Sequence, residues 1–243
     1  MRVLGVIPAR FASSRLPGKP LVDLGGETLV MRVVQAARSA LEINRLVVAT
    51  DHEKVRASVE ASGGEVLMTS PDHPSGSDRC AEVLQSFEAQ GQLFDLVANI
   101  QGDEPFLPGE AMDKAIQILK EHPTCQVATL AVPLTAGDRE DPHVVKLRAT
   151  PDGVAEAFGR EPDWEPTHTH VGFYVFRRDY LMRFVDLPQS ESEKRERLEQ
   201  LRILDDGVEI RVAAGAWPVL GVDTPEDLEL ARKKYKNRFE AEV

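Results

Sequence analysis

The stretch VLGVIPARFASSRLPGKP, residues 3–20, decides the fold of this chain. It begins with Val3 to Ile7, a short apolar run rich in β-branched residues, which is typical of a buried strand. A loop without any acidic side chain follows and leads to an amphipathic pattern from Thr28 to Ala40, which predicts a helix. A strand, a loop and a helix in this order form the first unit of a parallel α/β sheet.

The same alternation continues along the first half of the chain. Further strands are predicted at Leu46 to Thr50, Val66 to Met68, Leu96 to Ile100 and Val127 to Val132. The helices between them are predicted at His52 to Ser62, Asp78 to Ala89 and Gly109 to Glu121. Such alternation predicts an α/β protein with a Rossmann-like, mostly parallel, doubly wound sheet. Ligands of such sheets bind at the carboxyl ends of the strands.

The pattern changes after about Pro133, where proline, aspartate and glycine cluster. Strands are predicted there without helices between them, and His168 to Phe176 is one of these strands. We therefore expect a single domain over residues 1–243 that contains a β-rich insertion at about residues 134–190.

The end of the chain is predicted to be helical. A helix is predicted from Ser190 to Leu204, with Ser190 and Glu193 in the spacing of a capping box. Ion pairs one turn apart are predicted within this helix, from Glu191 to Arg195 and from Glu193 to Arg197. The last stretch, Lys233 to Val243, is predicted as a helix that frays into a tail.

Composition excludes several classes of protein. With 243 residues and a net charge of −11, the chain does not favour generic nucleic-acid binding, which depends on many basic side chains. The only cysteines, Cys80 and Cys125, lack metal-type spacing and are expected to be reduced thiols. No apolar run is long enough to span a bilayer, and the beginning of the chain is unlike a signal peptide. We expect a cytoplasmic protein without membrane contact.

The loop after the first strand is basic although the chain as a whole is acidic. Arg10, Arg15 and Lys19 lie in it together with serine hydroxyls, and this set suits a polyphosphate. The glycine spacing of a Walker loop is absent. From these residues alone, a solvated basic turn is an equally good interpretation.

Two separated aspartates are candidates for a metal site. Asp103 follows the predicted strand Leu96 to Ile100, so it is expected in the ligand crevice. Asp223 precedes Thr224, a predicted N-cap, and by itself is better explained as part of a helix start. Taken together, two carboxylates suit Mg²⁺, which prefers hard oxygen ligands and often binds one or two carboxylates plus substrate phosphates.

A set of motifs in a fixed order resembles one known family, that of 3-deoxy-manno-octulosonate (Kdo) cytidylyltransferase, or CMP-Kdo synthetase. These motifs are Ile7-Pro8-Ala9-Arg10, Ser14-Arg15-Leu16-Pro17-Gly18-Lys19-Pro20-Leu21, Ala49-Thr50-Asp51, Ser75-Gly76-Ser77-Asp78-Arg79, Gln101-Gly102-Asp103-Glu104-Pro105, Ala128-Thr129-Leu130-Ala131-Val132-Pro133, Leu198-Glu199-Gln200-Leu201-Arg202 and Gly221-Val222-Asp223-Thr224-Pro225-Glu226-Asp227. They span nearly the whole chain.

The resemblance implies a fold, a reaction and an assembly. The fold would be that of a nucleotide-diphospho-sugar transferase, with the β-rich insertion used for dimerisation and sugar binding. The enzyme would be a homodimer that makes CMP-Kdo and pyrophosphate from CTP and Kdo, with Mg²⁺, for lipopolysaccharide biosynthesis.

The resemblance also assigns roles to individual residues. The catalytic group would be Arg10, Lys19, Asp103 and Asp223, of which Asp103 and Asp223 would bind the metal. The nucleotide would contact Ala9, Ser13, Arg15, Arg79 and Gln101. The sugar would contact Arg15, Arg160, His170, Tyr174, Glu199 and Gln200.

Several alternatives remain open at this point. The segment Phe158 to Pro166 is shorter than its counterpart in the family, so a related sugar acid, such as 8-amino-Kdo or a nonulosonate, is an alternative substrate. A non-catalytic nucleotide-binding subunit is an alternative from another class. Arg79 has a structural explanation as well, because Ser77 and Asp78 form a plausible helix start. His168 and His170 face one side of a strand, but two histidines without a third ligand favour ordinary hydrogen bonding over zinc.

Overall fold

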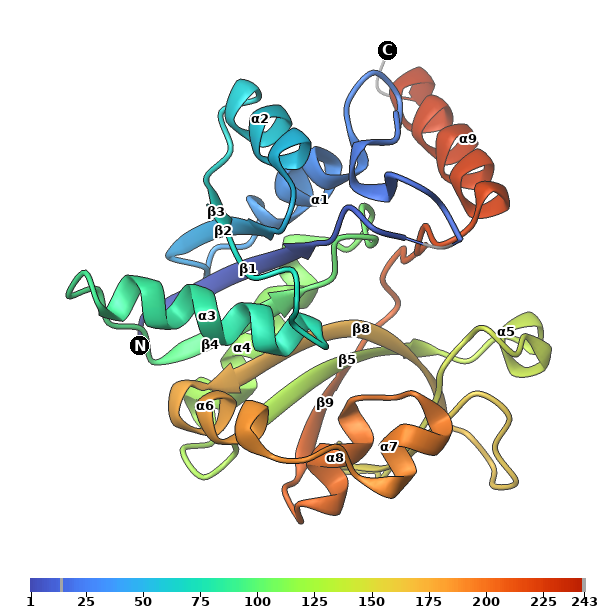
Figure 1. The fold of residues 1–243 in the computed structure, drawn as a ribbon. Coiled ribbons are helices and arrows are strands. Elements are labelled where there is room, and N and C mark those ends of the chain that lie inside the picture. Colours follow the sequence, from blue (N-terminus) through green and yellow to red (C-terminus); the bar gives the residue numbers. More distant parts are fainter. Residues whose placement is uncertain (14, 242–243) are drawn as a thin grey trace.

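The structure is a computed structural model that describes residues 1–13 and 15–241. Its centre is a nine-stranded sheet in the order β3-β2-β1-β4-β8-β5-β9, with β6 and β7 attached beside β8 (Figure 1). Helices lie on both faces of this sheet. The predicted α/β class is therefore confirmed.

The first half of the sheet is parallel. It consists of β1 (Val3–Ala9), β2 (Arg45–Thr50), β3 (Val66–Met68) and β4 (Leu96–Ile100). The helices that alternate with these strands are α1 (Leu29–Ala37), α2 (Glu53–Ala61), α3 (Gly76–Glu88) and α4 (Gly109–Glu121). All eight elements were predicted, although α1 is shorter at its carboxyl end and α3 begins two residues earlier.

The second half of the sheet mixes strand directions. β8 (His168–Arg177) pairs antiparallel with both β4 and β5 (Val127–Pro133), and β9 (Ile210–Ala214) pairs parallel with β5. A hairpin of β6 (Lys146–Ala149) and β7 (Ala155–Gly159) extends from β8. Two helices lie in the same region, α5 (Ala136–Glu140) and α6 (Arg178–Asp186). The division of the chain into a single domain with an insertion at about residues 134–190 stays a prediction.

The helix predicted from Ser190 to Leu204 is wrong as one continuous element. The structure has α7 (Glu191–Glu196) and α8 (Gln200–Asp205), separated at Arg197, which has a left-handed backbone with φ of 56°. The predicted capping box of Ser190 and Glu193 is present. The predicted ion pairs within the helix are replaced, because Glu193 pairs with Arg202 and Arg195 pairs with Glu196.

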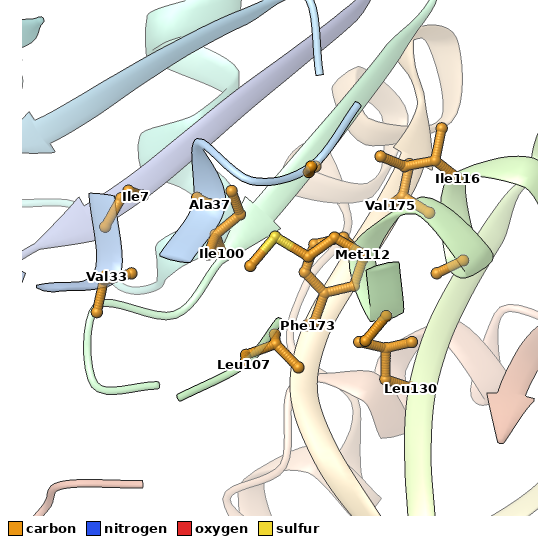
Figure 2. Packing of buried hydrophobic residues seen from close by; sticks show 14 of the residues in the cluster. Ile7, Val33, Ala37, Ile100, Leu107, Met112, Ile116, Leu130, Phe173 and Val175 are labelled. Carbon is orange, nitrogen blue, oxygen red and sulfur yellow. The ribbon is translucent and has the colours of Figure 1, made fainter. Parts of the chain in front are cut away.

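Apolar side chains fill both sides of the sheet. Alternate residues of β1 point to opposite faces, so Val3 and Ile7 join one core cluster while Leu4 and Val6 join the other. Figure 2 shows the first cluster, in which Met112 of α4 and Phe173 of β8 lie close to Ile100 at the end of β4. Because β1 and β4 are buried on both faces, the loops at their carboxyl ends start from fixed positions.

The last helix brings the end of the chain back to its beginning. α9 (Pro225–Ala241) packs through Leu228 and Ala231 against Leu24 and Leu29, which belong to the segment after the basic loop (Figure 1). The fraying predicted for Lys233 to Val243 concerns in part residues 242–243, which lie outside the described residues.

Two further predictions concern single features. Cys80 and Cys125 are free thiols, and both are buried. Within residues 1–13 and 15–241, no helix combines the length and the apolar character needed to cross a membrane.

Candidate active site

A charged cavity of about 420 Å³ opens where β1 and β4 end. This volume is in the range of small-molecule sites. Its lining consists of Pro8, Ala9, Arg10, Ala12, Ser13, Arg15, Lys19, Pro20, Pro74, Ser75, Gly76, Arg79, Asn99, Gln101, Gly102, Asp103, Glu199 and Asp223. The predicted basic loop, both predicted aspartates and three further predicted residues thus meet in one place.

Lys19 connects the two aspartates. Its Nζ donates hydrogen bonds to Asp103 Oδ2 at 2.6 Å and to Asp223 Oδ1 at 2.8 Å. Burial by itself would lower the pKa of Lys19, but the attraction of Asp103 and Asp223 outweighs it and raises the pKa above its usual value. The lysine is therefore a permanent cation at neutral pH.

Asp223 receives a second cation. Arg15 Nη2 lies 3.1 Å from Asp223 Oδ1, on the more exposed side of the cluster. Burial would raise the pKa of Asp223, but Lys19 and Arg15 together lower it. Two carboxylates and two cations thus meet around one point.

Short-range backbone features place these side chains. Gly18 has a left-handed backbone with φ of 65° and starts the short 3-10 turn η1 (Lys19–Leu21), so that Lys19 turns back to the sheet. A Cβ on Gly102 would lie 2.7 Å from the carbonyl oxygen of Pro8, so only glycine lets the segment after β4 pass so close to β1. The amide of Val222 donates to the carbonyl of Asp103 at 2.9 Å. This bond links the two segments that carry the aspartates.

The helix start near Asp223 does not use its carboxylate. Thr224 Oγ1 accepts from the amide of Asp227 at 3.2 Å, and Asp227 Oδ2 accepts from the amides of Asp223 and Thr224. Thr224 therefore caps α9 as predicted. Because Asp227 completes the cap, the Asp223 carboxylate is left to face Lys19 and Arg15.

Arg79 also lines the cavity, and its side chain is only 1% exposed. The helix start predicted at Ser77 and Asp78 is wrong, because Ser75 is the N-cap of α3 and accepts from both of their amides. Arg79 therefore lies in the first turn of this helix. Its guanidinium donates to Asp51 Oδ2 at 3.0 Å and to Thr69 Oγ1 at 2.5 Å.

The predicted nucleotide contacts Gln101 and Ser13 and the predicted catalytic residue Arg10 also line the cavity. Gln101 packs against β8, where a Cβ on Gly172 would lie 2.8 Å from the Gln101 side chain. Ser13 Oγ accepts from the amide of Leu16 at 3.3 Å, which braces the basic loop. Arg10 donates to the carbonyl of His73 and so ties the loop to the segment before α3.

The predicted sugar residues are placed less uniformly. Glu199 lines the cavity, and its Oε1 accepts from Ser75 Oγ at 2.7 Å. Burial raises the pKa of Glu199 above its usual value. Among the described residues, the lining does not include Arg160, His170, Tyr174 or Gln200.

Each of these four residues lies in other surroundings. Arg160 donates to the carbonyl of Glu196 at 2.8 Å, at the end of α7. His170 Nε2 lies 3.0 Å from Thr129 Oγ1, and its ring is 5.4 Å from that of Tyr174. The hydroxyl of Tyr174 is buried and has no hydrogen-bond partner among the described residues. Gln200 is buried at the start of α8.

Some residues of the site were missed from the sequence. Ser75 caps α3 and contacts Glu199, and its place before Gly76 was a usable signal because serine is a preferred N-cap. Asn99 is a buried amide inside the apolar strand β4 and donates to Ser77 Oγ at 3.3 Å. A polar side chain in an otherwise apolar strand is itself a sign of a nearby site.

The donor set fits a hard divalent cation. Two carboxylates, Asp103 and Asp223, converge on the same ammonium group within 2.6 and 2.8 Å. Among the described residues, no cluster of three or more His, Cys, Asp or Glu side chains lies in metal-binding geometry. A pair of carboxylates is the protein contribution expected for Mg²⁺ bound together with substrate phosphates.

Comparisons with known proteins agree with this geometry. Residues 4–210 match the protein family described as Cytidylyltransferase. A 3-deoxy-manno-octulosonate cytidylyltransferase from Azorhizobium caulinodans is 48% identical over 238 residues, which cover 95% of this chain and 94% of the relative. One from Bacteroides thetaiotaomicron is 41% identical, with 98% of this chain and all of the relative covered (100%).

Solved structures give the same result. The structure of a CMP:2-keto-3-deoxy-manno-octonic acid synthetase complexed with CTP aligns with a TM-score of 0.91 at 36% identity and covers 98% of this chain and 100% of its own. A cytidylyltransferase from Leptospira borgpetersenii aligns with a TM-score of 0.67 at 16% identity, over 98% of this chain and 87% of its own. At that identity the second similarity concerns the fold alone.

An α/β sheet with this charged cavity at its strand ends is that of a nucleotidyltransferase. The sequence identity to relatives along nearly the whole chain shows to which family of nucleotidyltransferases it belongs. The chain belongs to the 3-deoxy-manno-octulosonate cytidylyltransferase family, which confirms the resemblance seen in its motifs.

Proposed function

We propose that the chain transfers the cytidylyl group of CTP to the anomeric hydroxyl of Kdo, which forms CMP-Kdo and pyrophosphate for lipopolysaccharide biosynthesis. The observation that carries this proposal is the contact of Lys19 with both Asp103 and Asp223 inside the cavity. One lysine, three arginines and two aspartates line the same cavity, and this set suits a triphosphate and its counter-ion.

The reaction is an in-line displacement at the α-phosphorus. A bond forms between the anomeric oxygen and this phosphorus, while the bond to the bridging oxygen breaks and pyrophosphate leaves. The protein contributes mainly position and charge. Lys19 and Arg10 offset the negative charge that builds on the pyrophosphate, and Arg15 lies beside them at the more exposed side.

Asp103 and Asp223 would hold the Mg²⁺ ion of the reaction. When bound, Mg²⁺ neutralises part of the triphosphate charge and makes the α-phosphorus a better electrophile. The residues fit this role because both carboxylates accept from the same ammonium group, and because Lys19 and Arg15 lower the pKa of Asp223. Their fixed arrangement supports the catalytic interpretation over that of a non-catalytic nucleotide-binding subunit.

The sugar acid is assigned by family and by charge. Kdo carries a carboxylate and many hydroxyls, and the cavity lining offers Arg15 and Glu199 for these groups. His170 and Tyr174 lie beside each other on β8, Gln200 is buried at the start of α8, and Arg160 contacts the end of α7. We also propose a homodimer, in which the β-rich part of the chain forms the contact.

Pyrophosphate release tests the proposal directly. The enzyme is supplied with CTP, Mg²⁺ and Kdo, and parallel reactions omit the sugar or replace it with 8-amino-Kdo or a sialic acid. Release with Kdo alone is expected. Release only with another sugar acid would reassign the substrate, and CTP binding without release under any condition would support the non-catalytic alternative. Light scattering after size exclusion gives the oligomeric state.

A further inference from the structure

Asp51 binds two parts of the site with its two carboxylate oxygens. It directly follows β2, and its side chain is 12% exposed. Oδ2 accepts from Arg79 Nη2 at 3.0 Å, and Oδ1 accepts from the backbone amide of Phe11 at 3.3 Å. One carboxylate therefore joins a guanidinium on α3 to the loop that follows β1.

The Arg79 side of this contact is almost completely desolvated. The side chain of Arg79 is 1% exposed, and Asp51 is the acidic partner in its salt bridge. Thr69 holds the other terminal nitrogen, and the hydroxyl of Thr69 in turn donates to the carbonyl of Thr50 at 3.2 Å. A buried guanidinium needs such a partner, because an unpaired buried charge is strongly unfavourable. Asp51 and Thr69 thus fix the plane of the Arg79 guanidinium.

The Phe11 side of the contact fixes the loop. The ring of Phe11 stacks on the ring of His52 with centroids 3.8 Å apart and planes 16° apart. Thr50 Oγ1 donates to the carbonyl of Ala9 at 2.7 Å. The end of β2 and the start of α2 therefore hold residues 9 and 11 on either side of Arg10, which lines the cavity together with Ala9.

We infer that Asp51 is a positioning residue for the nucleotide: it sets the guanidinium of Arg79 and the backbone after Ala9 at a fixed separation across the cavity. The inference rests on the proposed function, since it requires that the cavity binds CTP. Asp51 itself is not among the residues that line the cavity, so it acts through Arg79 and the loop.

The chemistry of pyrimidines makes this role measurable. Cytosine presents adjacent acceptors at O2 and N3, whereas uracil has a donor at N3. Arg79 lines the cavity, and its guanidinium N–H groups can only donate. A guanidinium held in one orientation therefore favours CTP over UTP, and one that has lost its anchor discriminates less. A purely structural role of Asp51 would leave this ratio unchanged.

The test is the binding of CTP and UTP to the Asp51→Asn variant, measured by calorimetric titration without sugar. Asparagine keeps the shape and keeps an oxygen for Phe11, but its amide group cannot accept from Arg79. We expect CTP to bind about tenfold more weakly or worse, because a charge-assisted hydrogen bond is lost, and the CTP to UTP affinity ratio to fall. Wild-type values for both in a folded Asp51→Asn variant would overturn the inference.

Asp113→Asn is the matched control. Asp113 is also a buried aspartate, 8% exposed, and accepts from the amides of Leu41 and Glu42, both at 2.9 Å, away from the cavity. This variant should lose stability without a change in CTP affinity. If Asp51→Asn does not fold, Asp51→Glu replaces it, because glutamate keeps the charge but displaces it by one methylene. The CTP affinity and the CTP to UTP affinity ratio of this variant then test the inference. If the wild-type protein itself does not bind CTP, the proposed function is wrong. If the wild type binds CTP and Asp51→Asn behaves like it, only the inference about Asp51 is wrong.

Discussion

Lys19 and Asp223 are 204 residues apart in the chain, and their side chains meet at 2.8 Å. The contact depends on α9, which packs against the segment after the basic loop, and on the backbone hydrogen bond from Val222 to Asp103. The same ammonium group also holds Asp103 at 2.6 Å. Lys19 is therefore the counter-ion of both carboxylates that we assign to the metal.

Replacement of Lys19 by methionine should separate metal binding from catalysis. The Lys19→Met variant keeps an unbranched side chain and removes its charge, so the two carboxylates lose their internal counter-ion. Without nucleotide, we expect this variant to bind Mn²⁺ about tenfold more tightly than the wild type. Pyrophosphate release should nevertheless fall at least about a hundredfold. Electron paramagnetic resonance of free Mn²⁺ measures the binding, and weaker binding by the variant would contradict the counter-ion role.

Asp103→Asn should abolish pyrophosphate release while the protein stays folded. The change keeps the shape of the side chain but removes the negative charge that a divalent cation requires. Thermal unfolding monitored by circular dichroism establishes the fold. Asp95→Asn is a control at the other end of β4, where Asp95 accepts from the amide of Arg2 at 2.6 Å, and it should retain activity. Substantial turnover by Asp103→Asn in Mg²⁺ would refute the assignment.

The parts of the fold that were predictable are those decided by local pattern. β1, β2 and β4 are apolar runs because they are buried on both faces, and α4 has the bounds that its amphipathic pattern indicated. β9 was missed because it carries Arg211 among its apolar residues. The break at Arg197 was missed for another reason. It depends on Glu193 reaching Arg202 in the next helix, and a local helical pattern does not contain that competing contact.

The residues of the site likewise include some that could be predicted from the sequence and some that could not. The basic loop and Asp103 were found because such charges are unusual after predicted strands, whereas Asp223 was found because it matches a metal-binding position of the family. The residues that hold them were missed, since their partners are distant in sequence: Ser75 contacts Glu199 across 124 positions, and Asp51 contacts Phe11 across 40. The charged residues of the site could thus be predicted from the sequence, whereas the contacts that position them could be identified only in the folded structure.

His170 should give the protein a specific sensitivity to acid. Burial lowers the pKa of His170 to about 3 from a usual value of 6.5, so the folded protein keeps this ring neutral while the unfolded chain protonates it below pH 6.5. The unfolded state then binds more protons, and the free energy of unfolding falls as the pH falls from 6.5 towards 3. One such group contributes a slope of up to about 1.4 kcal/mol per pH unit. Urea unfolding between pH 6.5 and pH 4 should therefore show a shallower decline for His170→Asn, and parallel curves would contradict this.

The ion pair of Glu193 and Arg202 should dominate the stability of the α7–α8 segment, which carries Glu199 to the cavity. The two side chains are 5% and 6% exposed and meet through two hydrogen bonds of 2.8 Å. Glu193→Gln leaves the Arg202 charge buried without its partner, so we expect the free energy of unfolding to fall by about 3–5 kcal/mol and the melting temperature to fall by roughly 10 °C. Glu191→Gln removes the exposed pair with Lys194 on the same helix and should leave the free energy of unfolding almost unchanged, because solvent screens this pair. Equal losses of the free energy of unfolding in the two variants would show that burial does not strengthen the pair of Glu193 and Arg202.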